Sequence, residues 1–92
     1  MESSFWKVGN KYFVRTVTHY TVGQLKAIEG DELIFDHATW IADTSRYHQF
    51  IVNGTVGEAE PYPPDMDVLI NRTSIIDACP WLHSLALKQN VK

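Results

Sequence analysis

Two long runs of β-branched and aromatic residues, at 11–28 and 32–42, most constrain what this chain can fold into. Residues of these types favour extended backbone on a pleated, half-buried surface. Gly23 lies inside the first run, where a lone glycine marks a bend, a bulge or a close approach of two backbones. We therefore predict strands over 12–20, 22–28 and 32–42, with a tight turn at 29–31.

Residues 43–66 interrupt the strand pattern. The side chains at 43–45 (Asp, Thr and Ser) are of the types that cap helix N-termini, and Gly54 is the type that ends a helix. We therefore predict a short helix over 45–52. The segment 55–65 is predicted to be a proline-rich loop, because its prolines disfavour regular structure and favour an extended course.

Two more short strands are predicted at 67–70 and 74–79, and the link between them is too short for a crossover. The tail after Pro80 is predicted to be a partial helix anchored by Trp81. These elements predict a mainly β fold, a small and strongly bent five-stranded barrel with one short helix. The expected organisation is a single domain over 1–92, made of an N-terminal segment (1–10), a barrel (11–80) with an insertion (43–66), and a tail (81–92).

Charge and cysteine content exclude several classes of protein. The net charge is −3, and the eight Lys and Arg residues are spread thinly. A protein that binds nucleic acid without sequence preference needs a basic surface to neutralise phosphates, which argues against that class. The single cysteine cannot form an intrachain disulfide. The N-terminus does not resemble a signal peptide, and no apolar run is long enough for a membrane span. We expect a cytoplasmic protein with no membrane partner.

The sequence gives little sign of catalysis. The four histidines lack metal-ligand spacing, and adjacent Asp36 and His37 are expected to face opposite sides of a strand. Cys79 follows an apolar strand, which favours a buried structural thiol over a nucleophile. The chain has no nucleophile elbow, P-loop or dinucleotide-binding glycine pattern. We therefore predict no catalytic residue, no metal site and no cofactor, and an enzyme is the least favoured class.

One stretch combines residue types that bind nucleotides. Trp40, Asp43, Arg46 and Tyr47 lie within eight residues at the end of a predicted strand. Tryptophan and tyrosine stack on bases, and arginine pairs with phosphate. The structural alternative places Trp40 in the core and Asp43 at the helix cap, with Arg46 and Tyr47 on the solvated helix face.

Residues 17–41 resemble the first sequence motif of Sm-like proteins, with a bend glycine, a turn and an apolar strand. Residues 67–78, DVLINRTSIIDA, resemble the second motif, in which two short strands flank a tight link. In Sm-like proteins this link helps to line a nucleotide pocket around the pore of a ring, and Asn71 and Arg72 occupy the matching positions. The resemblance implies a cyclic homo-oligomer and RNA binding. The chain departs from the family in its weak N-terminal helix and in its long segment at 43–67.

Two interpretations of Arg72 remain open. It can be an exposed turn residue paired with Asp67 or Asp77. Alternatively, the same arginine repeated around a ring would form a circle of guanidinium groups that grips phosphate bidentately.

Most of the chain also resembles a family of small, uncharacterised phage and prophage proteins. The resemblance lies in KYFVRTVTHYTVGQL, HATWIADTSRY, EAEPYP and INRTSIIDACPWLH. It implies a viral or prophage origin and action in the cytoplasm of an infected or lysogenic bacterium. It implies no established activity.

Three functional hypotheses follow. The leading one is a non-enzymatic, homo-oligomeric protein that captures a small phosphorylated molecule or nucleotide, as a phage would to sequester a host immune signal. Its predicted ligand-binding residues are Arg72, Asn71, Arg46, Trp40, Tyr47 and Asp43. The second hypothesis is an Sm-like protein that binds single-stranded RNA. The third is a structural or partner-binding phage protein without a small ligand.

Overall fold

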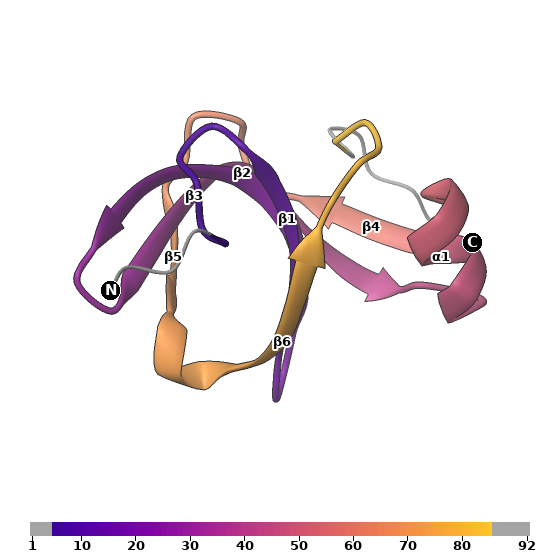
Figure 1. Ribbon diagram of the computed structural model, residues 1–92. Coiled ribbons are helices and arrows are strands. Elements are labelled where there is room, and N and C mark those ends of the chain that lie inside the picture. Colours follow the sequence, from indigo (N-terminus) through magenta and orange to yellow (C-terminus); the bar gives the residue numbers. More distant parts are fainter. Residues whose placement is uncertain (1–4, 86–92) are drawn as a thin grey trace.

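The computed structural model describes residues 5–85, which form a six-stranded antiparallel sheet and one short α-helix (Figure 1). This confirms the mainly β class, but six strands replace the five expected. In chain order the elements are β1 (Lys11–Thr16), β2 (Tyr20–Glu29), β3 (Glu32–Asp43), α1 (Tyr47–Asn53), β4 (Glu58–Pro61), β5 (Val68–Asn71), the 3₁₀ turn η1 (Arg72–Ser74) and β6 (Ile75–Pro80).

The strand order is β4-β3-β2-β1-β6, and β5 also pairs with β3. The first half of β3 pairs with β5 and its second half with β4. Figure 1 shows the strands curling round so that β5, η1 and β6 form one side of the curve. Within the described chain β5 and β6 do not pair with each other, so the predicted barrel is not closed.

The additional strand β4 comes from the segment that we predicted to be a loop throughout. Its residues pair with the second half of β3, from Thr39↔Pro61 to Asp43↔Glu58. Pro61 is compatible with this strand because β4 lies at an edge of the described sheet and needs hydrogen bonds on one side only. Proline content alone therefore did not exclude a strand here.

The first predicted strand is also corrected. It was expected to run through 12–20, but β1 ends at Thr16 and a turn at 17–19 leads into β2. The Thr16 N–H donates to the His19 carbonyl at 2.9 Å, and the Thr16 hydroxyl oxygen accepts from the His19 N–H at 3.2 Å. These local bonds close the turn despite the β-branched residues within it.

A bulge in β3 lies opposite Gly23 and bends the sheet. Between the partners of Val22 and Gln24, β3 contains one residue more than β2, and His37 there has φ +48°. A Cβ atom on Gly23 would lie 3.2 Å from the Cβ of Ala38. The prediction that Gly23 marks a bulge or a close approach of two backbones is therefore confirmed, and β2 continues through it from Tyr20 to Glu29.

The sheet buries apolar side chains on both of its faces. Within β1, Tyr12 and Val14 face one core while Phe13 faces the other, because side chains alternate along a strand. Helix α1 covers the second face through Phe50, whose ring lies 4.9 Å from that of Phe13. The first core contains Tyr12, Val14, Leu25, Leu33, Phe35, Ala38 and Ile70. The second contains Phe13, Val22, Ile41, Phe50, Ala59 and Trp81.

The predicted helix is confirmed at Tyr47–Asn53, and Gly54 ends it with φ +73°. Its N-cap is Arg46, which makes no side-chain capping bond, so the capping role predicted for 43–45 is wrong. Residues 81–85 are not helical, and the rest of the predicted tail helix lies outside the described residues. Trp81 is buried in the second core, as its anchoring role requires.

We predict that Gly23→Val destabilises the protein by about 1–3 kcal/mol, because its added carbons would overpack the contact with Ala38 and Phe35. The measurement is urea unfolding of the purified variant. As a control, Ala42→Val places the same valine side chain at an exposed position of β3 and should leave the unfolding midpoint nearly unchanged. Equal midpoints for the two variants would show that the close approach at Gly23 is unimportant.

Candidate functional site

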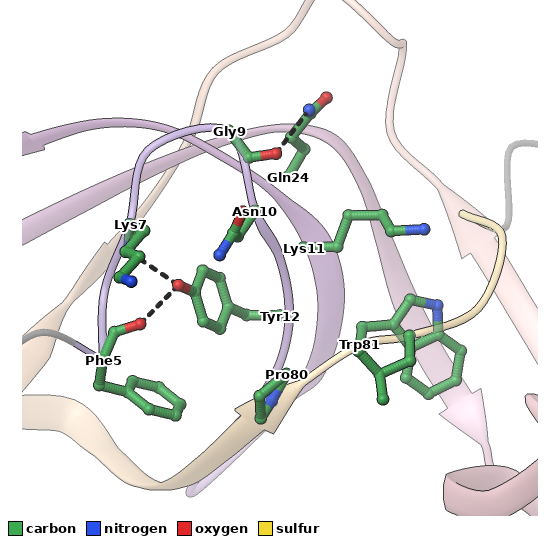
Figure 2. A pocket seen from close by; sticks show the side chains of 10 residues that line it. Phe5, Lys7, Gly9, Asn10, Lys11, Tyr12, Gln24, Pro80 and Trp81 are labelled. Carbon is green, nitrogen blue, oxygen red and sulfur yellow. Dashed lines mark hydrogen bonds between the residues drawn. The ribbon is translucent and has the colours of Figure 1, made fainter.

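The N-terminal segment, residues 5–10, lies over the start of β1 and bounds a pocket of about 620 Å³ (Figure 2). This volume falls within the usual range of about 300–1,000 Å³ for small-molecule sites. The segment, β1, β2 and the end of β6 all contribute to its walls. The lining residues are Phe5, Lys7, Gly9, Asn10, Lys11, Tyr12, Gln24, Pro80, Trp81 and Leu82.

Hydrogen bonds hold the N-terminal segment against the sheet. The Tyr12 hydroxyl donates to the Phe5 carbonyl at 2.6 Å and accepts from the backbone N–H of Lys7 at 2.8 Å. The Gln24 side chain donates to the Gly9 carbonyl at 3.0 Å. Gly9 has φ +98°, a conformation that favours glycine. A buried tyrosine and a glycine turn therefore form one side of the pocket.

The pocket is positively charged in an acidic chain. Lys7 and Lys11 line it, whereas no acidic residue does so in the part of the chain that the structure describes. The Lys11 ammonium group donates to the His83 carbonyl, which fixes the side chain and leaves two of its three N–H donors. Within residues 5–85 neither lysine forms an ion pair. The pocket is therefore suited to an anion.

Sequence reasoning missed this pocket. Lys7 and Lys11 were counted only among thinly spread charges, and Gln24 lies far from both in the sequence. The four-residue spacing of the two lysines carries no motif. They come together because the segment turns back at Gly9 over the first strand, which a pattern of residues does not reveal.

Arg72, which the sequence singled out, begins the turn η1 between β5 and β6. Its backbone N–H donates to the Asp31 carbonyl at 2.6 Å, and its Nη2 donates to the Gly30 carbonyl at 3.1 Å. Its Nε is buried and has no partner among the described residues. Arg72 lines a second pocket, of about 350 Å³, with Phe5, Trp6, Ile75 and Ala78.

Arg72 pairs with neither Asp67 nor Asp77, which was one of the two interpretations of this residue. Asp77 accepts two bonds from Arg15, at 2.7 and 2.5 Å, and the Arg15 guanidinium holds the pKa of that carboxyl below its usual value. Asp67 pairs with Lys26 at 2.7 Å. Arg72 forms no ion pair within residues 5–85.

Asn71 organises the turn that presents Arg72. Its side-chain oxygen accepts from the backbone N–H of Thr73 at 2.9 Å and from the Thr73 hydroxyl at 2.6 Å. The Asn71 carbonyl also accepts from the Ser74 hydroxyl at 2.7 Å. Capping therefore occupies the amide oxygen, and the amide nitrogen remains for the ligand contact that the sequence predicted.

Of the other four predicted residues, Asp43, Arg46 and Tyr47 lie in or just before α1, whereas Trp40 lies further back on β3. Trp40 is partly exposed on β3 with its ring 5.5 Å from that of His19. The Asp43 carboxylate accepts from the Ser45 N–H at 2.7 Å. Arg46 is exposed, and Tyr47 contacts Phe13 and Phe50 at ring distances of 6.2 and 6.3 Å. Burial raises the pKa of the Tyr47 hydroxyl.

The six predicted residues therefore do not form a single site within one chain. Asn71 pairs with Glu32 at the first end of β3, whereas Asp43 is the last residue of that strand. Twelve residues of strand extend over up to about 35–40 Å along their path. Figure 1 accordingly shows η1 and α1 on opposite sides of the molecule.

The structure also places the residues considered for catalysis. The Nδ1 of His37 lies 3.1 Å from the Oδ1 of Asp36, because the positive φ of His37 breaks the side-chain alternation that we expected to separate them. Burial raises the pKa of the half-buried Cys79 thiol, which keeps it protonated at neutral pH. No group of three or more potential metal ligands occurs between residues 5 and 85.

No protein-family model, curated protein or solved structure matches this chain. None of the helices in its described part has the length and apolar character that a membrane span requires.

We predict that Asn71→Ala lowers the free energy of unfolding by about 1 kcal/mol, the usual cost of losing a capping acceptor. Asn71→Asp retains the acceptor oxygen and should unfold close to the wild type in urea. Asn53→Ala is a matched control, because the one side-chain bond of Asn53 within residues 5–85 is to the exposed Gln49 side chain. The capping role is wrong if Asn71→Ala costs no more than Asn53→Ala.

Proposed function

We propose that this protein is a non-enzymatic binding protein that captures a small phosphorylated molecule, such as a nucleotide, in the pocket beneath its N-terminal segment. One observation carries the proposal. Two of the eight Lys and Arg residues line a pocket of about 620 Å³ to which no described acidic residue contributes, although acidic residues outnumber basic ones in the chain.

The pocket combines the two kinds of contact that a nucleotide needs. Lysine ammonium groups bind phosphate as point charges. Phe5 and Trp81 contribute aromatic surface to the lining, which suits a flat ligand group, and the Phe5 residue as a whole is 38% exposed. The amide groups of Asn10 and Gln24 can bond a base or a sugar.

We further propose that several copies assemble through the outer edges of β5 and β6. In the described sheet β5 pairs only with β3 and β6 only with β1, so each strand has one uncovered edge. Pairing these edges between copies would remove exposed strand edges. Leu69 and Ile76, on these strands, are exposed apolar side chains that such contacts would cover.

The strand order β6-β1-β2-β3-β5 and the short η1 link support assigning the fold to small curved barrels of the Sm-like and SH3-like type. We propose a cyclic assembly on that basis. The proposed setting is the cytoplasm of a bacterium infected by a phage or carrying a prophage, where capture of a nucleotide signal would protect the phage.

The test is the double variant Lys7→Gln, Lys11→Gln, with binding of the four nucleoside 5′-monophosphates measured by isothermal titration calorimetry. We expect at least one of them to bind the wild type, and the variant to bind it at least tenfold more weakly, because both cations of the pocket are gone. Arg46→Gln removes one positive charge near α1 and should retain binding.

Unchanged binding by the lysine variant would reject the proposed pocket, and a loss confined to Arg46→Gln would move the site to α1. Salt separates the proposal from RNA binding. A strand that contacts many phosphates is released steeply as salt rises, whereas one nucleotide in a pocket responds less.

A further inference from the structure

We infer that the captured ligand carries a second anionic group, which Arg72 holds in a pocket that adjoins the first one at Phe5. This inference rests on the proposed function, because it extends the same site. It assigns the ligand to molecules with two separated phosphate or carboxylate groups joined by a flat ring system.

The position of Phe5 is the first observation. Phe5 lines both the pocket that contains Lys7 and Lys11, here called the lysine pocket, and the pocket that contains Arg72, here called the Arg72 pocket. The Phe5 ring centroid lies 5.3 Å from that of Tyr12, which lines the lysine pocket and not the Arg72 pocket. It lies 4.8 Å from that of Trp6, which lines the Arg72 pocket and not the lysine pocket. The two pockets therefore adjoin at Phe5, whose ring contributes aromatic surface to both.

The charge of the second pocket is the next observation. Its other lining residues, Trp6, Ile75 and Ala78, are all uncharged, and Arg72 has no ion pair within 5–85. A guanidinium that forms no ion pair with the described residues, beside aromatic and aliphatic walls, is suited to a phosphate or carboxylate, which it can bind through two parallel bonds. The lysine pocket has the same excess of positive charge.

These observations together restrict the ligand. The described linings of the two pockets share only Phe5, so a single small anion bound by Lys7 and Lys11 does not contact Arg72. A ligand that uses both cationic groups must place one anionic group in each pocket and a portion between them beside Phe5, where a flat ring system would stack. A nucleoside with two separate phosphates, or a dinucleotide, meets this description, whereas inorganic phosphate does not.

The experiment compares the four nucleoside 5′-monophosphates with the four nucleoside 3′,5′-bisphosphates by titration calorimetry on the full chain. The wild type should bind its preferred bisphosphate at least tenfold more tightly than the matching monophosphate. Arg72→Gln should abolish that gain and leave monophosphate affinity unchanged. Arg72→Lys keeps the charge without the bidentate fork and should retain part of the gain.

The outcomes distinguish this inference from the proposed function. The inference is wrong, although the lysine pocket is still supported, if the Arg72→Gln variant still binds the bisphosphate more tightly than the monophosphate. It is also wrong if the variant loses as much affinity for the monophosphate as for the bisphosphate. If the double variant Lys7→Gln, Lys11→Gln binds both sets of compounds as the wild type does, the proposed function is wrong, and the inference is wrong with it. Both are also wrong if the wild type binds none of the eight compounds. The urea midpoint of each arginine variant controls for loss of the bond from Arg72 to the Gly30 carbonyl.

Discussion

The fold depends on the close approach of Gly23 to the bulge in β3. The extra residue at His37 and the missing side chain at Gly23 let β3 bend between its two halves. The first half then pairs with β5 and the second with β4, in the same strand. Without this bend a twelve-residue strand would continue straight, and η1 could not return the chain to β6 beside β1.

The proposed binding region is a consequence of this bend. Because β5 and β6 are not paired in the described chain, the curved sheet leaves an opening on that side, and Phe5 and Trp6 pack there against Tyr12. Tyr12 therefore contributes both to the stability of the fold and to the shape of the proposed binding site. Its ring belongs to the first core, while its hydroxyl fixes the segment that carries Phe5 and Lys7.

The sequence predicted features that depend on local chemistry. The turn at Gly30, the end of α1 at Gly54 and the tight link at Asn71 and Arg72 are encoded by residues adjacent in the chain. Features that depend on distant pairing were missed. The pairing of β4 with β3 overrode the prolines of its segment, and the partners of Asp67 and Asp77 were set by strands far away in sequence.

The candidate site follows the same division. Arg72 was identified from its place in a short link, which is a local property. Its separation from Arg46 depends on the length of β3, and the meeting of Lys7 and Lys11 with Gln24 depends on how the N-terminal segment crosses the sheet. The spacing of residues along the chain reveals none of these relations. The sequence therefore shows which residue types suit a nucleotide, but not which of them lie together in space.

The most direct test of the central claim is native mass spectrometry on protein purified gently from bacterial cytoplasm, followed by denaturing release of any bound molecule. We expect a discrete oligomer that carries a repeated small mass, and that mass would begin to identify the ligand. A bare monomer would contradict this expectation, because neither assembly through β5 and β6 nor capture in the lysine pocket would then occur under native conditions.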